Sequence, residues 1–116
     1  TVGILATKGT LSAQLYQNAL GEAGVPYLTP EAAEQDALMR VIYDGVKSGK
    51  GPDAYRADLL TVVEHMMTRG AGVFLLGCTE LPLAAEAVGL TVPAVDPTAE
   101  LAKAAIRFCG FRVRAK

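Results

Sequence analysis

Four short apolar runs, each followed by a segment with a different periodicity, constrain this chain more than any other feature. The runs are Val2–Ala6, Val25–Pro30, Gly72–Leu76 and Val92–Val95. Strands that alternate with helices are joined by crossover connections, and such connections make the strands of one sheet parallel. The sequence therefore predicts a three-layer α/β domain, in which helices flank a parallel sheet of about four strands.

The segments between these runs carry apolar residues at helical spacing, which predicts five helices. The first begins between residues 10 and 12, after a flexible polar turn at 7–10, and ends between 21 and 23. The next three are predicted over 31–47, 54–69 and 81–88. The last follows an Asp96-Pro97-Thr98 cap and runs through Phe108, and a basic tail is predicted over 112–116.

Composition indicates one compact globular domain. The 116 residues, 51% of them apolar, are enough to bury a core without disulfides or metals. Eleven basic and twelve acidic residues form no basic stripe, so we expect no nucleic acid as a partner. Apolar stretches are too short for a membrane span and no signal-peptide pattern is present, which predicts a cytoplasmic location. Because a strand begins at Val2 with no Met before it, we expect the chain to begin within a longer protein.

The third apolar run ends in Gly77-Cys78-Thr79-Glu80-Leu81-Pro82, where a strand is predicted to stop and a helix to start at once. A thiol at this position lies at the rim of the sheet, beside the positive end of a helix dipole. That environment stabilises a thiolate, which makes Cys78 a candidate base or nucleophile. The structural alternative is a small buried residue that closes the strand. The second cysteine, Cys109, is predicted to be a core residue. The sequence does not decide whether the two cysteines form a disulfide.

The two residues after Cys78 each have a structural and a functional interpretation. Thr79 either caps the following helix or holds a substrate carboxylate with its hydroxyl and its backbone amide. Glu80 either complements the helix dipole or exchanges a proton with the thiol.

Three further polar groups could have a structural or a functional role. Thr7–Thr10 follows the first strand, so it is expected beside Cys78 at the carboxyl edge of the sheet, where it could cradle an anion. Lys47 ends a predicted helix, where a cation favours the helix dipole. His65 is expected on a helix surface or in helix packing, because no second ligand stands one turn away. The sequence thus predicts no metal site.

Four segments resemble the second half of aspartate/glutamate racemases. They are Val2–Thr10 with Tyr16 one turn on, Ile42–Gly49, Leu76–Pro82 and Val92–Thr98. The cysteine motif in the third segment is specific, and the resemblance covers nearly the whole chain. It implies that residues 1–116 are a single α/β domain similar to the C-terminal domain of a two-domain enzyme, with the N-terminal domain absent.

The resemblance implies a racemase that needs no cofactor, neither pyridoxal phosphate nor a metal. In this family one cysteine from each domain acts on opposite faces of the substrate Cα, one removing a proton and the other returning one. The resemblance gives the second of these roles to Cys78, binding of the α-carboxylate to Thr79, and binding of a side-chain carboxylate to Lys47. The residues that would line the cleft are Thr7, Gly9 and Thr10.

Glu80 stands where glutamate racemases usually carry histidine, which favours the aspartate or broad-specificity branch and gives Glu80 a supporting role. The expected substrate is an acidic amino acid, aspartate or glutamate. Because the opposing cysteine belongs to the absent domain, we expect the isolated half to be inactive. An uncovered apolar face favours a homo-oligomer, and the closing helix, Asp96–Phe108, is expected to fold back alone or to exchange between chains.

Two other functions stay open at this point. One is a non-catalytic domain that binds small carboxylates, which the lack of a second reactive thiol favours. The other keeps the fold and the thiol but changes the reaction, as in a diacid isomerase, a decarboxylase or a hydantoin racemase. Those relatives usually differ from Thr-Glu-Leu-Pro after the second cysteine.

Overall fold

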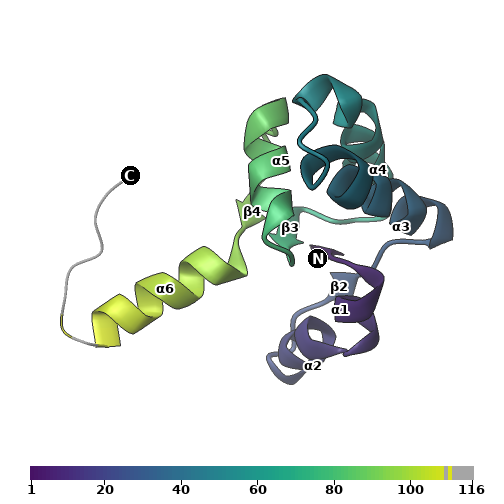
Figure 1. The fold of residues 1–116 in the computed structure, drawn as a ribbon. Coiled ribbons are helices and arrows are strands. Elements are labelled where there is room, and N and C mark those ends of the chain that lie inside the picture. The colour runs from purple at the N-terminus through teal and green to yellow at the C-terminus, as the bar shows by residue number, and fades with distance from the viewer. Residues whose placement is uncertain (109, 111–116) are drawn as a thin grey trace.

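The computed structural model describes residues 1–108 and 110 (Figure 1). The strands are β1 (Val2–Leu5), β2 (Tyr27–Leu28), β3 (Val73–Leu76) and β4 (Ala94–Val95). The helices are α1 (Lys8–Ser12), α2 (Leu15–Glu22), α3 (Ala32–Met39), the π-helix η1 (Arg40–Val46), the 3₁₀-helix η2 (Pro52–Ala54), α4 (Arg56–Thr68), α5 (Glu80–Val88) and α6 (Pro97–Phe108). Over the described part of the chain, no helix combines the length and the apolar character needed to cross a bilayer. The predictions for Cys109 and for a basic tail at 112–116 lie outside the described residues.

All four strands are parallel and lie in the order β2-β1-β3-β4, which confirms the predicted α/β fold. The central strands β1 and β3 pair along their whole length, from Val2 with Val73 to Leu5 with Leu76. In Figure 1, α1 and α2 lie below the sheet, whereas α4 and α5 lie above it. Right-handed crossovers explain this, because the chain leaves β1 toward β2 in one direction and reaches β3 and β4 in the other.

The hydrophobic core lies between the sheet and the helices α3, η1, α4 and α5. From the sheet, Leu5, Phe74 and Leu76 belong to this core, and Phe74 is fully buried. The largest fully buried helical side chains are Leu38, Val41, Ile42, Leu59, Val62, Val63, Met66 and Leu81. Each of the larger ones stabilises the fold by about 1.5–3 kcal/mol relative to an exposed position. One core thus supports the strands β1 and β3 and the helix η1, which the candidate site residues follow.

The segment after β1 differs from its prediction. It is not a flexible turn, because Thr7 is the N-cap of α1 and its hydroxyl accepts a hydrogen bond from the Thr10 N–H at 3.2 Å. The single helix predicted to begin at 10–12 and end at 21–23 is also wrong. It is two helices, broken at Gln14, whose φ of 59° is left-handed. Glutamine has no marked preference for that conformation, so no sequence signal shows the break.

The helix predicted over 31–47 is continuous, but its second half is wider than expected. α3 passes directly into η1, and the Lys47 N–H donates to the Ile42 carbonyl, five residues back, at 2.9 Å. Gly45 allows this segment to pack against Tyr55, since a Cβ there would lie 2.6 Å from the Tyr55 Cδ1 atom. Because a π-helix takes more residues per turn, it changes the side of the helix from which Lys47 projects.

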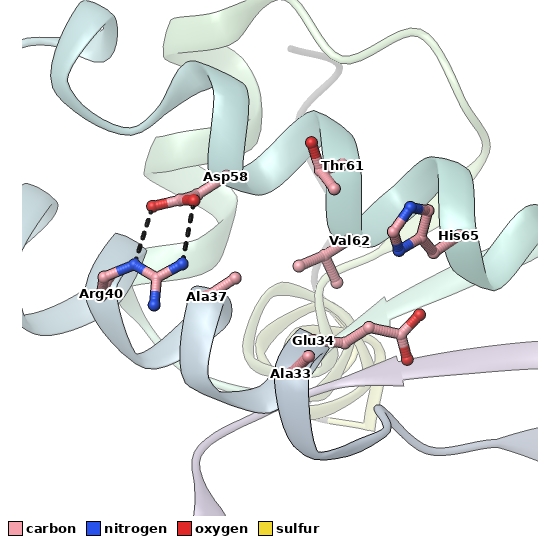
Figure 2. Close-up of a pocket in the computed structure, with 8 residues that line it drawn as sticks. All are labelled: Ala33, Glu34, Ala37, Arg40, Asp58, Thr61, Val62 and His65. Atoms are coloured by element: carbon pink, nitrogen blue, oxygen red, sulfur yellow. Dashed lines mark hydrogen bonds and ion pairs between the residues drawn. The ribbon is translucent and has the colours of Figure 1, made fainter.

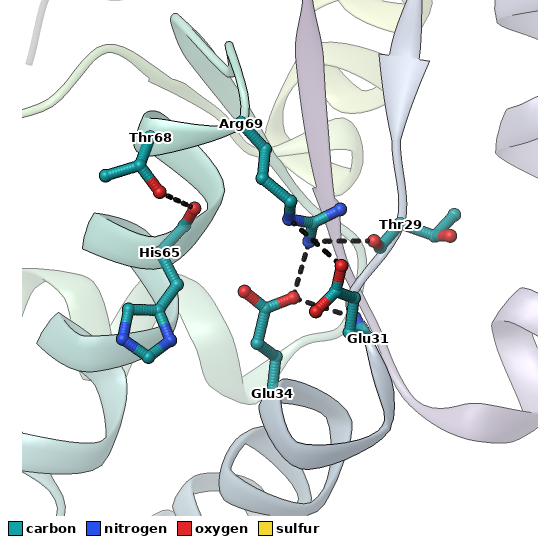
Figure 3. A network of polar contacts seen from close by, with 6 residues as sticks. All are labelled: Thr29, Glu31, Glu34, His65, Thr68 and Arg69. Carbon is teal, nitrogen blue, oxygen red and sulfur yellow. Dashed lines mark hydrogen bonds and ion pairs between the residues drawn. The ribbon is translucent and has the colours of Figure 1, made fainter.

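A polar network ties the start of α3 to the end of α4 (Figure 3). Arg69 follows α4 and donates hydrogen bonds to the Thr29 carbonyl at 3.2 Å and to the Glu34 carboxylate. Glu34 is 5% exposed and also accepts the Glu31 N–H at 2.7 Å, which completes a capping box. The network therefore fixes where α3 begins, and through α3 it sets the position of η1 and Lys47.

Candidate functional site

The carboxyl edge of the sheet brings the segments after β1 and β3 together. The Gly77 N–H donates to the Leu5 carbonyl at 2.7 Å, so the two backbone segments stay paired one residue beyond β3. A Cβ at Gly77 would lie 3.0 Å from the Ala6 Cβ and from the Tyr16 Cε2 atom, so glycine permits this close approach. The segments that begin with Thr7 and with Cys78 therefore share one edge, as the sequence predicts.

Cys78 is a half-buried free cysteine between β3 and α5. Burial raises the pKa of its thiol, the backbone N–H groups of Leu81 and Glu80 act in the opposite direction, and the Glu80 carboxylate raises it again. The predicted stabilisation of a thiolate by the helix N-terminus is thus present, but burial outweighs it. The Cys78 thiol consequently keeps its proton at neutral pH.

Glu80 contacts Lys47 and Thr79 and lies beside Cys78. Its carboxylate lies 3.6 Å from the Lys47 Nζ atom and accepts a hydrogen bond from the Thr79 hydroxyl at 3.0 Å. Burial raises the pKa of Glu80, but the Thr79 hydroxyl, its own backbone amide and Lys47 together bring that pKa below its ordinary value. An ionised carboxylate therefore stands beside the protonated Cys78.

Thr79 occupies the N-cap position of α5, but its side chain makes no capping hydrogen bond. The structural alternative, in which its hydroxyl caps the helix, is therefore wrong. The hydroxyl instead holds the Glu80 carboxylate.

Lys47 reaches this loop from a distant part of the chain. It is the C-terminal cap of η1, as its predicted place at a helix end requires. Its Nζ atom lies 4.8 Å from the centroid of the Tyr43 ring, a distance typical of a cation–π contact. The ammonium thus contacts both the Tyr43 ring and the Glu80 carboxylate.

Thr7, Gly9 and Thr10 form a separate polar group on the same edge. The Thr7 hydroxyl donates to the Thr10 hydroxyl at 3.0 Å, in addition to accepting the Thr10 N–H. Gly9 is exposed, and Lys8 turns toward Asp36 at 3.4 Å. Within residues 1–108, no hydrogen bond links this group to Cys78, Thr79 or Glu80, so the sheet edge alone brings the two groups near each other.

Gln35 holds the segment next to Thr7, a role that sequence reasoning missed. Its side-chain amide donates to the Ala6 carbonyl at 3.0 Å and is 6% exposed, and its Oε1 atom is buried without a hydrogen-bond partner among the described residues. The bond fixes the chain immediately before Thr7. A polar residue on the inward face of an otherwise apolar helical pattern was the available signal.

A cavity of about 160 Å³ lies on the helical layer, between α3 and α4 (Figure 2). Arg40 and Asp58 close one side with two hydrogen bonds of 3.2 and 3.1 Å, and Glu34 and His65 lie at the other. None of the candidate residues lines it. In the described ranges, no cluster of three or more His, Cys, Asp and Glu residues could hold a metal ion.

Known proteins resemble this chain in sequence. An uncharacterized protein in the pnlA 3′ region of Pectobacterium carotovorum subsp. carotovorum is 38% identical over 109 residues, covering 92% of this chain and 71% of that protein. The family model for Asp/Glu/hydantoin racemases matches residues 1–105.

Solved structures resemble the fold. The aspartate racemase of Picrophilus torridus is 26% identical with a TM-score of 0.75, covering 97% of this chain and 46% of that one. An aspartate racemase homologue from Pyrococcus horikoshii OT3 is 27% identical with a TM-score of 0.80, covering 94% of this chain and 48% of that one. The chain thus spans about half the length of these structures. With a family model matched over nearly all of its length, the chain belongs to the Asp/Glu/hydantoin racemase family.

Proposed function

We propose that residues 1–116 form the second domain of a two-domain, cofactor-independent racemase that acts on an acidic amino acid. The observation that carries the proposal is the position of Cys78 at the start of α5, with Thr79, Glu80 and Lys47 around it. Family membership supports it, and so does the half-length match to an aspartate racemase.

Inversion at Cα needs a base on one face and an acid on the other. Cys78 keeps its proton, so in this state it acts as the acid. Its S–H bond breaks as a new C–H bond forms at Cα, while a base from the opposing domain has taken the original proton. The sulfur is left as a thiolate, which the N–H groups of Leu81 and Glu80 stabilise as it forms, and which is the base for the reverse reaction.

An acidic substrate presents two carboxylates to this edge. Lys47 binds the side-chain carboxylate, and Thr79 binds the α-carboxylate at the start of α5. The Lys47–Glu80 pair is partly exposed and 3.6 Å long, so it contributes little stability and a substrate carboxylate can compete for the ammonium. The residues that line the rest of the cleft are Thr7, Gly9 and Thr10.

Incubation of the full-length gene product with candidate substrates tests the proposal. Chiral chromatography follows L-aspartate, L-glutamate and a 5-substituted hydantoin, and NMR follows maleate. We expect racemisation of an acidic amino acid, with a KM at least about tenfold higher in Lys47→Met, because one charge-assisted contact is lost. Lys50→Met removes an exposed cation three residues away and is the matched control. Turnover of the hydantoin or maleate, with both amino acids untouched, would assign the other reactions of the family instead.

A carboxylate-binding domain without catalysis is the second candidate function. The raised pKa of Cys78 favours it, because a protonated thiol is not a base. Calorimetric titration with L-aspartate separates the two candidates. Binding that leaves the L-enantiomer unchanged after long incubation with the full-length product supports the binding domain.

A further inference from the structure

Tyr43 lies in η1 and contacts the side chain of Lys47, which follows that helix. The Lys47 Nζ atom is 4.8 Å from the centroid of the Tyr43 ring, within the range of cation–π contacts. The Tyr43 carbonyl accepts a hydrogen bond from the Ser48 hydroxyl at 2.7 Å, and the Lys47 N–H donates to the Ile42 carbonyl at 2.9 Å. These bonds fix the backbone from which both side chains extend.

The exposure of Tyr43 argues against a role in packing. Its side chain is 44% exposed and does not belong to the hydrophobic core, whereas Val41 and Ile42 of the same helix are fully buried members of it. Replacement of Tyr43 therefore leaves the core intact. The contact of its ring with the Lys47 ammonium is the feature that a role for this side chain can use.

The Lys47 ammonium has two neighbours of different character. The Glu80 carboxylate is negatively charged and lies 3.6 Å away, whereas the Tyr43 ring is neutral. The ring attracts a cation through the negative potential of its face. It carries no net charge that would repel an anion.

A substrate carboxylate would affect these two neighbours differently. When it binds to Lys47, it brings a second negative charge beside Glu80, and two carboxylates that share one cation repel each other. The pair between Lys47 and Glu80 is then weakened, while the contact with the ring is not. Of the two neighbours, Tyr43 is therefore the one that can hold the ammonium both before and after substrate binds.

We propose that Tyr43 is a positioning residue of the candidate site, and that its ring holds the Lys47 ammonium where it binds the side-chain carboxylate of an acidic amino acid. The inference rests on the proposed function, because that function gives Lys47 its role. It requires the aromatic ring of Tyr43 and not the hydroxyl group. Tyr43 thus acts through Lys47 on substrate affinity and takes no part in proton transfer at Cα.

Racemisation kinetics of the full-length gene product test the positioning role. We expect Tyr43→Leu to raise the KM for the acidic amino acid about two- to fivefold with kcat unchanged, because an exposed cation–π contact is lost. Tyr43→Phe keeps the ring and should keep the wild-type KM. Tyr27→Leu is the matched control, since Tyr27 is similarly exposed but lies on β2. An unchanged KM in Tyr43→Leu overturns the proposal, and so does an equal rise in Tyr43→Phe.

A double-mutant cycle shows whether the effect passes through Lys47. Lys47→Met alone raises KM, and the addition of Tyr43→Leu should raise it no further, because the ammonium that the ring holds is gone. An equal rise of KM in both backgrounds contradicts the proposal, since Tyr43 would then act by another route.

NMR of the full-length product labelled with ¹³C-lysine gives a readout that does not depend on activity. The ring current of Tyr43 should displace the ε-methylene signals of Lys47, which are assigned by their loss in Lys47→Met. We expect Tyr43→Leu to abolish the displacement and Tyr43→Phe to keep it. Signals that do not move in Tyr43→Leu overturn the contact and with it this inference. Displaced signals in a wild type that racemises no acidic amino acid confirm the contact but overturn the proposed function, and with it the role in substrate binding.

Discussion

At the scale of single residues, Cys78 and Glu80 decide the protonation state of the candidate site. Burial and the Glu80 carboxylate keep the proton on sulfur, whereas the first N–H groups of α5 favour its loss. Because folding raises the pKa of Cys78, the folded chain binds this proton more tightly than the unfolded chain does. The thiol therefore stabilises the fold fully below the ordinary thiol pKa, and this stability is lost as the pH rises through the higher pKa of the folded state.

Glu80→Gln is expected to lower the pKa of Cys78, because it removes a negative charge beside the sulfur. The measurement is the rate of iodoacetamide alkylation as a function of pH in a Cys109→Ser chain, where Cys78 is the only thiol. The midpoint should move to lower pH and the rate near pH 8 should rise.

Glu86→Gln is the control for this shift, because Glu86 is an exposed acid two turns further along α5. An identical midpoint in wild type and Glu80→Gln would show that Glu80 does not act on the thiol.

Gly45→Ala is expected to destabilise the fold by about 1–3 kcal/mol, because a Cβ would overlap the Tyr55 ring, which is buried and cannot move away. Urea unfolding measures the change. Gly51→Ala meets no atom within 4 Å and has a φ of −73°, so its free energy of unfolding should stay the same or rise slightly. Equal stability of the two variants would mean that Gly45 is not needed for this packing.

At the scale of elements, the sequence pattern predicted helix ends correctly where a glycine or a capping side chain stands. α5 ends at Val88, as predicted, where Gly89 takes the left-handed conformation, and Asp96 caps α6 at its predicted place. Thr7 is not a turn residue, because its hydroxyl serves as the N-cap of α1, and the glycine two residues later had suggested a turn. The break at Gln14 and the π-helix before Lys47 depend on tertiary packing, and periodicity alone does not reveal them.

The edge position of Cys78 was predictable because an apolar strand pattern is followed closely by a helical pattern, and only residues 77–79 lie between β3 and α5. Its raised pKa was not, because burial and the approach of Glu80 are properties of the folded chain. The Lys47–Glu80 contact likewise joins residues far apart in sequence, and Lys47 follows the π-helix η1, which the sequence did not predict.

Glu34→Ala is expected to lower the free energy of unfolding by about 1–3 kcal/mol, because it removes the buried partner of Arg69 and the bond to the Glu31 N–H. Thermal or urea denaturation measures it. Asp53→Ala is the control, because it removes only an ion pair between Arg56 and an Asp53 side chain that is 98% exposed. It should change the free energy of unfolding by less than about 0.5 kcal/mol. If both changes are equally mild, the network in Figure 3 does not hold α3 to α4.

At the scale of the whole molecule, the proposed function requires this fold to supply one face of a catalytic cleft. Solved relatives are about twice as long as this chain, and inversion at Cα needs groups on both faces of the substrate. The parallel sheet presents Cys78 at its carboxyl edge, and the core that it forms with α3, η1, α4 and α5 lies on one of its faces.

The central claim is that Cys78 transfers a proton at the Cα atom of an acidic amino acid. The most direct measurement is the conversion of L-aspartate or L-glutamate in D₂O to the D-enantiomer that carries deuterium at Cα, with the full-length gene product. We predict this inversion with wild type, and a rate at least about 100-fold lower with Cys78→Ala, because the general acid–base group on one face of Cα is lost. Equal rates for the two proteins would contradict the account.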